Sequence, residues 1–146
     1  MSGPARAGLF VYAKDLAHLA HFYQSILGMS RVHESADMVI LQSPDIQLLV
    51  HLIPPHIASN IVIRSPPQRR ENTALKFFFT VPSIAGARTA AFALGGEVFS
   101  EHWQGPGFIV CNACDPEGNV FQVRESAPQP SAGGRPMKPH AQELCR

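Results

Sequence analysis

The sequence of 146 residues contains the same order of predicted elements twice, and this repeat is the feature that most constrains the fold. Each half predicts one strand, then a helix, then three more strands. The strands of the first half lie at 9–12, 30–34, 37–42 and 46–53, and its helix runs to residue 27. The strands of the second half lie at 75–81, at 97–102 and in a hairpin over 108–125, and its helix follows residue 83. The repeat therefore predicts an α+β fold with one module in each half.

The two predicted helices begin and end with matching residues. Asp15 and Ser83 are suited to the N-cap position, where a side-chain oxygen accepts a hydrogen bond from a first-turn amide. Gly28 and Gly95 follow the helices where a glycine commonly ends them in the left-handed conformation. The apolar residues of the first helix recur at spacings of three and four, so we expect one buried stripe on it.

The hairpin over 108–125 is the most clearly marked element. Pro116 and Gly118 suit a tight turn, because proline fixes φ and glycine tolerates positive φ. After the turn, polar and apolar residues alternate, which predicts a strand with one apolar face and one polar face. Gln122 lies in the middle of the polar face. The side chain of a polar residue at such a position is expected to point away from the hydrophobic core.

Composition excludes several classes of function. The net charge of +1 argues against binding to nucleic acid or to an anionic membrane surface. No segment is long and apolar enough to span a bilayer. The three cysteines are too few for a disulfide framework, which favours a reducing, cytoplasmic setting.

The predicted organisation has five parts. We expect an irregular lead-in, a first module, a long loop, a second module and a tail, at residues 1–8, 9–53, 54–74, 75–126 and 127–146. The loop is rich in proline and arginine, with a possible short strand at 61–63, and a loop of this length usually acts as a lid or a linker. The tail is rich in proline and glycine, so we expect it to be disordered or loosely attached.

Short motifs in both halves resemble those of the vicinal oxygen chelate superfamily, which includes glyoxalase I, bleomycin-resistance proteins, extradiol dioxygenases and fosfomycin-resistance enzymes. The first-half motifs are Lys14-Asp15-Leu16, Phe22-Tyr23 and Leu27-Gly28-Met29, and the second-half motifs are Gly95-Gly96-Glu97 and Asp115-Pro116-Glu117-Gly118-Asn119. The resemblance covers roughly residues 9–125. It implies two βαβββ modules whose sheets form an open, cupped barrel around a ligand, and usually a homodimer.

In metal-dependent members, the resemblance implies one divalent ion held by His, Gln or Glu on the first and last strands of each module. Three of the four positions fall at Gly8, Lys76 and Gln122. The fourth falls at His51 or, with a shift of one residue, at Val50. Glycine has no ligating side chain and an ammonium group repels a cation. His51 and Gln122 are the remaining candidates, so we expect a degenerate metal site and no required cofactor.

Side-chain alternation along the strands predicts the lining of the cup. The lining combines aromatic walls with a few polar heads: Phe10, Tyr12, His51, Lys76, Phe78, Thr80, Gln122 and Arg124. This composition is typical of a small-molecule site. Lys76 and Arg124 favour an anionic or carbonyl-bearing ligand. Alternatively, both side chains reach the rim of the barrel and contact only water.

These observations predict a small-molecule-binding protein of the glyoxalase and bleomycin-resistance type, with a degenerate metal site. It would enclose an aromatic, carbonyl-bearing or anionic ligand. The alternative is a metal-dependent lyase, isomerase or dioxygenase of the same superfamily, using His51 and Gln122 with Mn, Fe, Ni or Zn. A third hypothesis is an interaction module whose cup is filled by its own aromatic side chains. The sequence identifies no catalytic residue, so whether the protein is an enzyme stays open at this point.

Three further signals have structural interpretations. Cys111 and Cys114 have the spacing of a redox or zinc motif, but positions three apart on a strand point to opposite faces, so we expect buried thiols. His18 and His21 lie opposite the apolar stripe of the first helix and are expected to be exposed. Trp103 follows His102 at the end of a strand, where the pair either closes the cup over a ligand or lies in an interface or the core.

Overall fold

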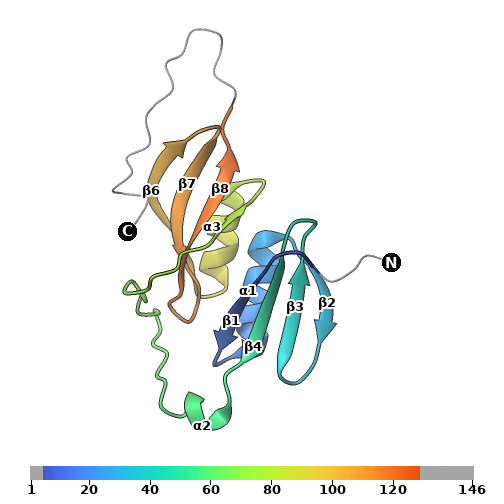
Figure 1. Ribbon diagram of the computed structural model, residues 1–146. Coiled ribbons are helices and arrows are strands. Elements are labelled where there is room, and N and C mark those ends of the chain that lie inside the picture. The colour runs from blue at the N-terminus through green and yellow to red at the C-terminus, as the bar shows by residue number, and fades with distance from the viewer. Residues whose placement is uncertain (1–4, 129–146) are drawn as a thin grey trace.

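The computed structural model describes residues 5–128, which form two four-stranded sheets that do not close into a barrel (Figure 1). The first module contains β1 (Gly8–Ala13), α1 (Leu16–Leu27), β2 (Ser30–Glu34), β3 (Met38–Gln42) and β4 (Gln47–Leu52), with strand order β1-β4-β3-β2. The second contains β5 (Phe78–Thr80), α3 (Ile84–Ala93), β6 (Glu97–Gly105), β7 (Phe108–Cys114) and β8 (Val120–Ser126), with order β5-β8-β7-β6. The predicted α+β fold of two βαβββ modules is confirmed.

Local signals in the sequence determine both module helices. The Asp15 side chain accepts a hydrogen bond from the His18 amide, and Gly28 ends α1 with φ of 64°. The Ser83 side chain accepts from the Gly86 amide at the start of α3. Each bond satisfies an amide that has no partner within the helix.

The segment between the modules differs from the prediction. Residues 61–63 form no strand, because the Ile61 amide bonds back to the Ala58 carbonyl in a turn. The short helix α2 (Pro55–Ala58) precedes them, and Pro55 suits its first turn because proline has no amide hydrogen to leave unpaired. The strand predicted at 75–81 is also shorter, since only residues 78–80 pair with β8. Lys76 therefore precedes β5, and the prediction that it lies on the strand is wrong.

The two modules share one core between their sheets. Leu41, Val50, Phe121 and other buried residues of both sheets belong to a single apolar cluster with the helices. Helices α1 and α3 contact each other, and within the described range no strand of one sheet pairs with a strand of the other. Among the described residues, no helix is both long and apolar enough to cross a membrane. Most of the predicted tail, from residue 129 onward, lies outside the described range.

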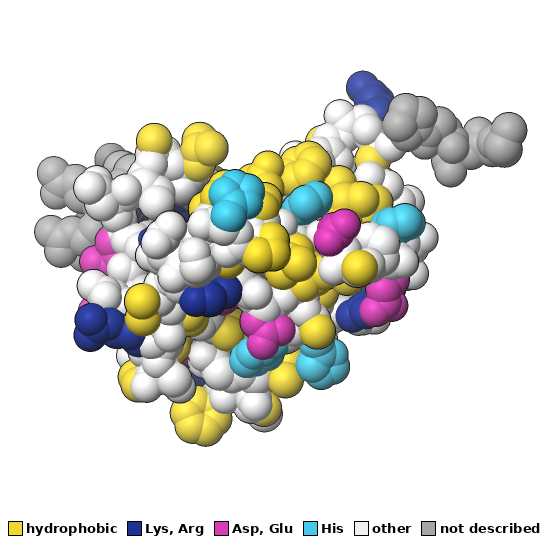
Figure 2. All heavy atoms as spheres, turned by 90° about the horizontal axis from the view of Figure 1, so that it is seen from below, with side chains coloured by type: hydrophobic (Ala, Val, Ile, Leu, Met, Phe, Trp, Pro, Cys, Tyr) yellow, Lys and Arg dark blue, Asp and Glu magenta, His cyan; other side chains and the backbone are white. Residues whose placement is uncertain are grey.

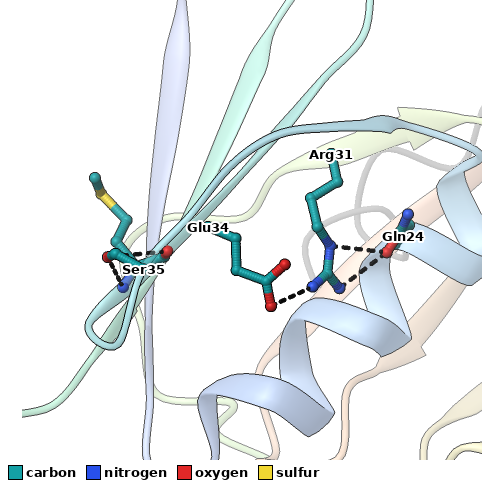
Figure 3. A network of polar contacts seen from close by, with 5 residues as sticks. Gln24, Arg31, Glu34 and Ser35 are labelled. Carbon is teal, nitrogen blue, oxygen red and sulfur yellow. Dashed lines mark hydrogen bonds and ion pairs between the residues drawn. The ribbon is translucent and has the colours of Figure 1, made fainter.

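A polar network attaches the outer strand of the first sheet to its helix (Figure 3). The Arg31 guanidinium on β2 donates two hydrogen bonds to Gln24 on α1, at 3.2 and 2.9 Å, and forms an ion pair with Glu34 at 3.0 Å. Ser35 accepts from the Met38 amide in the turn that follows. The bonds from Arg31 to Gln24 hold β2 against α1 and so fix the edge of the sheet farthest from β1.

Candidate functional site

The first sheet has one face packed on the helices and one open face that carries aromatic side chains. Val11 is buried against the helices, whereas its neighbours Phe10 and Tyr12 are 54% and 58% exposed. Tyr12 pairs with His51 in the β1–β4 register, and their ring centroids are 6.0 Å apart. Val50 is fully buried in the core. Of the two registers that the sequence left open, the structure therefore places His51 on the open face.

Apolar groups and histidines are both exposed at the surface in this region of the molecule. Figure 2 shows hydrophobic side chains gathered together, with histidines among and beside them, in the view from below. The open face of the first sheet also includes the half-buried residues Met38, Ile40 and Leu49, which share the register of His51 and Phe10. This face is therefore largely apolar with one imidazole.

The open face of the second sheet is organised around Arg124. On β8, Phe121 and Val123 are fully buried in the core, and Arg124 points to the other side together with Gln122. The Arg124 guanidinium carbon lies 3.6 Å from the ring centre of Phe78 and 4.3 Å from that of Phe108. These rings come from β5 and β7, the strands on either side of β8, so aromatic rings from both neighbouring strands contact the guanidinium. Thr80 pairs with Arg124 in register and is exposed beside it.

A cluster of amides and one ammonium group lies on the same open face. Lys76 Nζ and Gln122 Nε2 both donate to Asn112 Oδ1, each at 3.3 Å. Asn112 and Gln122 are directly paired in the β7–β8 register and are buried. Although Lys76 precedes β5, its side chain still reaches the predicted position. The Lys76 side chain bonds to Asn112. The alternative that Lys76 contacts only water at the rim of the barrel is therefore wrong.

Two residues of this face were not predicted from the sequence, namely Asn112 and Phe108. Both lie on β7, whose apolar composition gave no reason to assign a face. The turn at 115–119 contains the missing signal, because counting outward from it along both strands pairs Asn112 with Gln122. Trp103 is half-buried and pairs with Val110, opposite Arg124, which puts it on this face as well.

The eight predicted lining residues thus fall into two groups, one on each sheet. Phe10, Tyr12 and His51 lie together on the first sheet, and the other five lie on or beside the second: Lys76, Phe78, Thr80, Gln122 and Arg124. The helices pack against the inner side of each sheet and against one another, so the two open faces point away from this shared core.

The residues present do not fit the divalent metal of the superfamily. Gly8 offers no ligand, although a Cβ there would meet nothing closer than 3.4 Å, so a larger side chain would have room. His51 Nδ1 bonds to the Leu52 carbonyl at 2.8 Å, and the Gln122 amide bonds to Asn112. Among residues 5–128, no group of three or more His, Cys, Asp or Glu is placed to hold an ion. A weak amide and one imidazole form a poor donor set.

The two thiols of the second sheet are buried and have raised pKa values. Cys111 and Cys114 are free and buried on β7, as expected from their spacing. Burial raises the pKa of Cys114 to about 12 and raises that of Cys111 above its ordinary value. Both groups therefore stay protonated near neutral pH and supply no thiolate nucleophile or metal ligand.

Residues of the first-half and second-half motifs contact each other and hold the two modules together. Asp115, in the β7–β8 turn, is fully buried and accepts a 2.6 Å hydrogen bond from the Tyr23 hydroxyl of α1. It also accepts from the amides of Glu117 and Asn119 and from the Asn119 side chain. Burial raises the pKa of Asp115, while these hydrogen bonds act in the opposite direction. These residues are structural, and they lie away from both open faces.

Glu117 completes this junction at the N-terminus of α1. Its two carboxylate oxygens accept from the backbone amides of Lys14 and Asp15, at 2.7 and 3.0 Å. The carboxylate is buried and lies at the end of the helix where negative charge is favourable. The exposed His18 bonds through Nε2 to the Leu94 carbonyl at 2.6 Å. The predicted exposure of His18 is therefore confirmed, and the ring also joins α1 to the end of α3.

A separate cleft of about 560 Å³ lies beside this junction. It is lined by the start of α1, the inter-module loop and the β7–β8 turn, including Lys14, His18, Arg64 and Glu117. None of the eight predicted ligand residues lines it. Several of its polar groups already bond within the protein, so we assign the candidate site to the open sheet faces.

Comparison with known families agrees with the topology and the motifs. Residues 8–124 match the family described as glyoxalase-like domain, which is well over half of the chain. The chain therefore belongs to this family and has the vicinal oxygen chelate fold. A search of curated proteins gives no significant match.

Solved structures share the fold at low sequence identity. A glyoxalase/bleomycin resistance protein from Albidiferax ferrireducens T118 is 18% identical, with a TM-score of 0.60 over 83% of this chain and 98% of that one. A glyoxalase-related enzyme from Fulvimarina pelagi is 17% identical, with a TM-score of 0.60 over 90% and 96%. Lactoylglutathione lyase from Agrobacterium tumefaciens is 23% identical, with a TM-score of 0.52 over 85% and 95%. These similarities show the fold and leave the activity undetermined.

Proposed function

We propose that this chain is a small-molecule-binding protein whose cup is assembled from two copies. The open face of the first sheet of one copy would face the open face of the second sheet of the other. The observation that carries the proposal is the exposure of Phe10, Tyr12 and Phe78, at 54%, 58% and 51%. Monomeric proteins rarely expose large contiguous apolar patches, and such patches commonly mark interfaces or ligand sites.

The sheet edges support the same assembly. β1 and β5 each lie at the edge of their sheet and pair on one side only, with β4 and β8 respectively. An unpaired edge strand is a template for pairing with another chain. Pairing of β1 from one copy with β5 from the other would join two open faces into one cup and bring His51 near Gln122.

The ligand is expected to have an aromatic body with a carbonyl or anionic group. The aromatic faces supply stacking surfaces, and Lys76, Gln122 and Arg124 supply hydrogen-bond donors. The donor set favours binding without a metal ion. The buried free thiols Cys111 and Cys114 favour a reducing, cytoplasmic location.

The assembly is tested by a charge substitution on the open face. Phe10→Asp should convert a dimer into a monomer in light scattering, because it introduces a carboxylate into the apolar interface. Phe92→Asp is the matched control, since Phe92 is 81% exposed and lies on helix α3, which packs against the inner side of its sheet. A wild-type protein that is monomeric at all concentrations, or a Phe10→Asp variant that stays dimeric, would contradict the proposal.

The metal-dependent alternative is tested by elemental analysis of the purified protein, followed by thermal unfolding with Mn²⁺, Fe²⁺, Ni²⁺ or Zn²⁺ added. An ion that binds the native state raises the unfolding midpoint. We expect no bound ion and no shift. Near-stoichiometric metal that is lost in His51→Ala would instead support a lyase, isomerase or dioxygenase.

A further inference from the structure

We propose that the ligand is a planar carboxylate and that Arg124 selects it. The inference rests on the proposed function, because it assigns a ligand class to the same cup. Arg124 becomes the specificity-determining residue, whose guanidinium pairs with the carboxylate group of an aromatic acid.

The charge of Arg124 has no ion-pair partner among the residues that the structure describes. The Nε atom is buried and has no hydrogen-bond partner. Among residues 5–128, no carboxylate forms an ion pair with Arg124. Its neighbour Glu125 belongs to the opposite side of β8, where its carboxylate accepts the Ile84 amide at the start of α3, at 2.7 Å. A partly buried cation without an anion is costly, and a bound carboxylate would remove that cost.

The rings of Phe78 and Phe108 determine which ligand geometry fits. They cover the guanidinium from the two flanking strands, at 3.6 and 4.3 Å from the guanidinium carbon to the ring centres. Because these rings lie directly against the guanidinium, the hydrogen-bond donors around its planar edge are the groups left for a ligand. A carboxylate is planar and accepts two parallel hydrogen bonds from a guanidinium edge. An aromatic body beyond the carboxylate would then extend over these same rings.

The electrostatic surroundings favour an anion. Burial lowers the pKa of Arg124, but an arginine stays charged near neutral pH. Lys76 adds a second positive charge on the same face, where it bonds to Asn112 at 3.3 Å. The chain therefore presents two cations on this face, one of them against two aromatic rings, a combination that favours an aromatic acid over its neutral amide.

Benzoate and benzamide test this inference, because they have nearly the same size and planarity and differ in charge. Trp103 is the only tryptophan and lies on the same open face, so its fluorescence reports binding in a titration. We expect benzoate to bind the wild-type protein at least roughly tenfold more tightly than benzamide does. Arg124→Gln should weaken benzoate binding by about 10- to 100-fold and leave benzamide binding nearly unchanged.

Two further variants keep the test decisive. Arg124→Lys retains the charge but lacks the planar fork, so an intermediate loss is expected and guards against a folding defect in Arg124→Gln. Arg64→Gln is the matched control, since Arg64 is an exposed arginine in the inter-module loop. Circular dichroism and the unfolding midpoint verify that each variant is folded.

The outcomes separate the inference from the proposed function. Equal affinities for benzoate and benzamide, or equal benzoate affinities of wild type and Arg124→Gln, would overturn the role of Arg124 but leave a dimeric binding cup intact. Tighter binding of phenyl phosphate than of benzoate would overturn the assignment to a planar carboxylate. Absence of benzoate binding at millimolar concentration would also overturn it, whereas a monomeric wild-type protein would remove the cup itself.

Discussion

The hydrogen bond from Tyr23 to Asp115 joins the two modules, and its removal gives a quantitative test of how they are held together. The bond is 2.6 Å long and connects residues 92 positions apart in the sequence. Both side chains are fully buried. Tyr23→Phe deletes only the hydroxyl group, so the aromatic packing of the ring against Phe22 and Phe121 is retained.

The expected loss in the free energy of unfolding is about 2–3 kcal/mol. A hydrogen bond to a charged group contributes about 1.5–3 kcal/mol, and the buried carboxylate left behind has no water to replace the donor. Asp115 retains three other donors, which limits the loss. For a chain of this length the unfolding midpoint should fall by roughly 6–10 °C.

The pH dependence distinguishes loss of this bond from loss of packing. Burial raises the pKa of Asp115, and the Tyr23 bond opposes that rise, so the pKa should be higher still in Tyr23→Phe. An acid whose pKa is higher in the native state than in the unfolded state loses stability as pH rises through that interval. The variant should therefore lose more stability than the wild type between acidic and neutral pH.

The free energy of unfolding above pH 10 gives a second way to detect the loss of this hydrogen bond. The pKa of Tyr23 is raised well above 10 by burial and by Asp115, so the native protein keeps a proton that the unfolded chain releases. The free energy of unfolding of the wild type should fall by about 1.4 kcal/mol per pH unit above pH 10 from this residue. Tyr23→Phe lacks this contribution, so the difference between the two proteins should shrink.

Urea unfolding at several pH values measures these differences. Tyr12→Phe is the matched control, because Tyr12 is the other tyrosine and is 58% exposed, so its change should stay within about 0.5 kcal/mol. A loss below 0.5 kcal/mol in Tyr23→Phe, or a loss that is the same at every pH, would refute the reasoning.

Three further predictions concern the same junction and the thiols. Glu117→Gln should lower the free energy of unfolding by about 1–2 kcal/mol in urea unfolding, because the amides of Lys14 and Asp15, just before α1, would share one neutral acceptor oxygen in place of two charged ones; no change would contradict this role of Glu117. Gly118→Ala should cost about 2 kcal/mol or more in the same assay, since φ is 92° and the added Cβ would lie 2.1 Å from the Gln68 carbonyl oxygen. Iodoacetamide should leave Cys111 and Cys114 unmodified in the native protein and modify both in denaturant, as read by peptide mapping; rapid native modification of Cys114 would contradict its pKa of about 12.

Local chemistry was sufficient to predict the helix ends and the faces of one strand. The caps at Asp15 and Ser83 and the left-handed Gly28 were predictable, because each depends on bonds within three or four residues. The faces of β8 were predictable for a similar reason, since alternation is a property of a strand by itself. By contrast, the possible strand at 61–63 does not form. A strand needs a neighbouring strand to pair with, and the local pattern does not supply one.

The sequence by itself therefore determined the repeated module, its helix boundaries and the outward-facing residues of β8, but not those of β7. Tertiary structure alone decided what those residues meet. That Asp115 accepts from Tyr23 and that Arg124 lies against the ring of Phe78 both depend on packing between segments distant in the chain. Such contacts form only when the global arrangement closes long loops, and no short-range periodicity encodes them. Tertiary packing also explains why the predicted lining residues lie in two groups, one on each sheet. The helices occupy the space between the two sheets, so the open faces cannot meet within one chain.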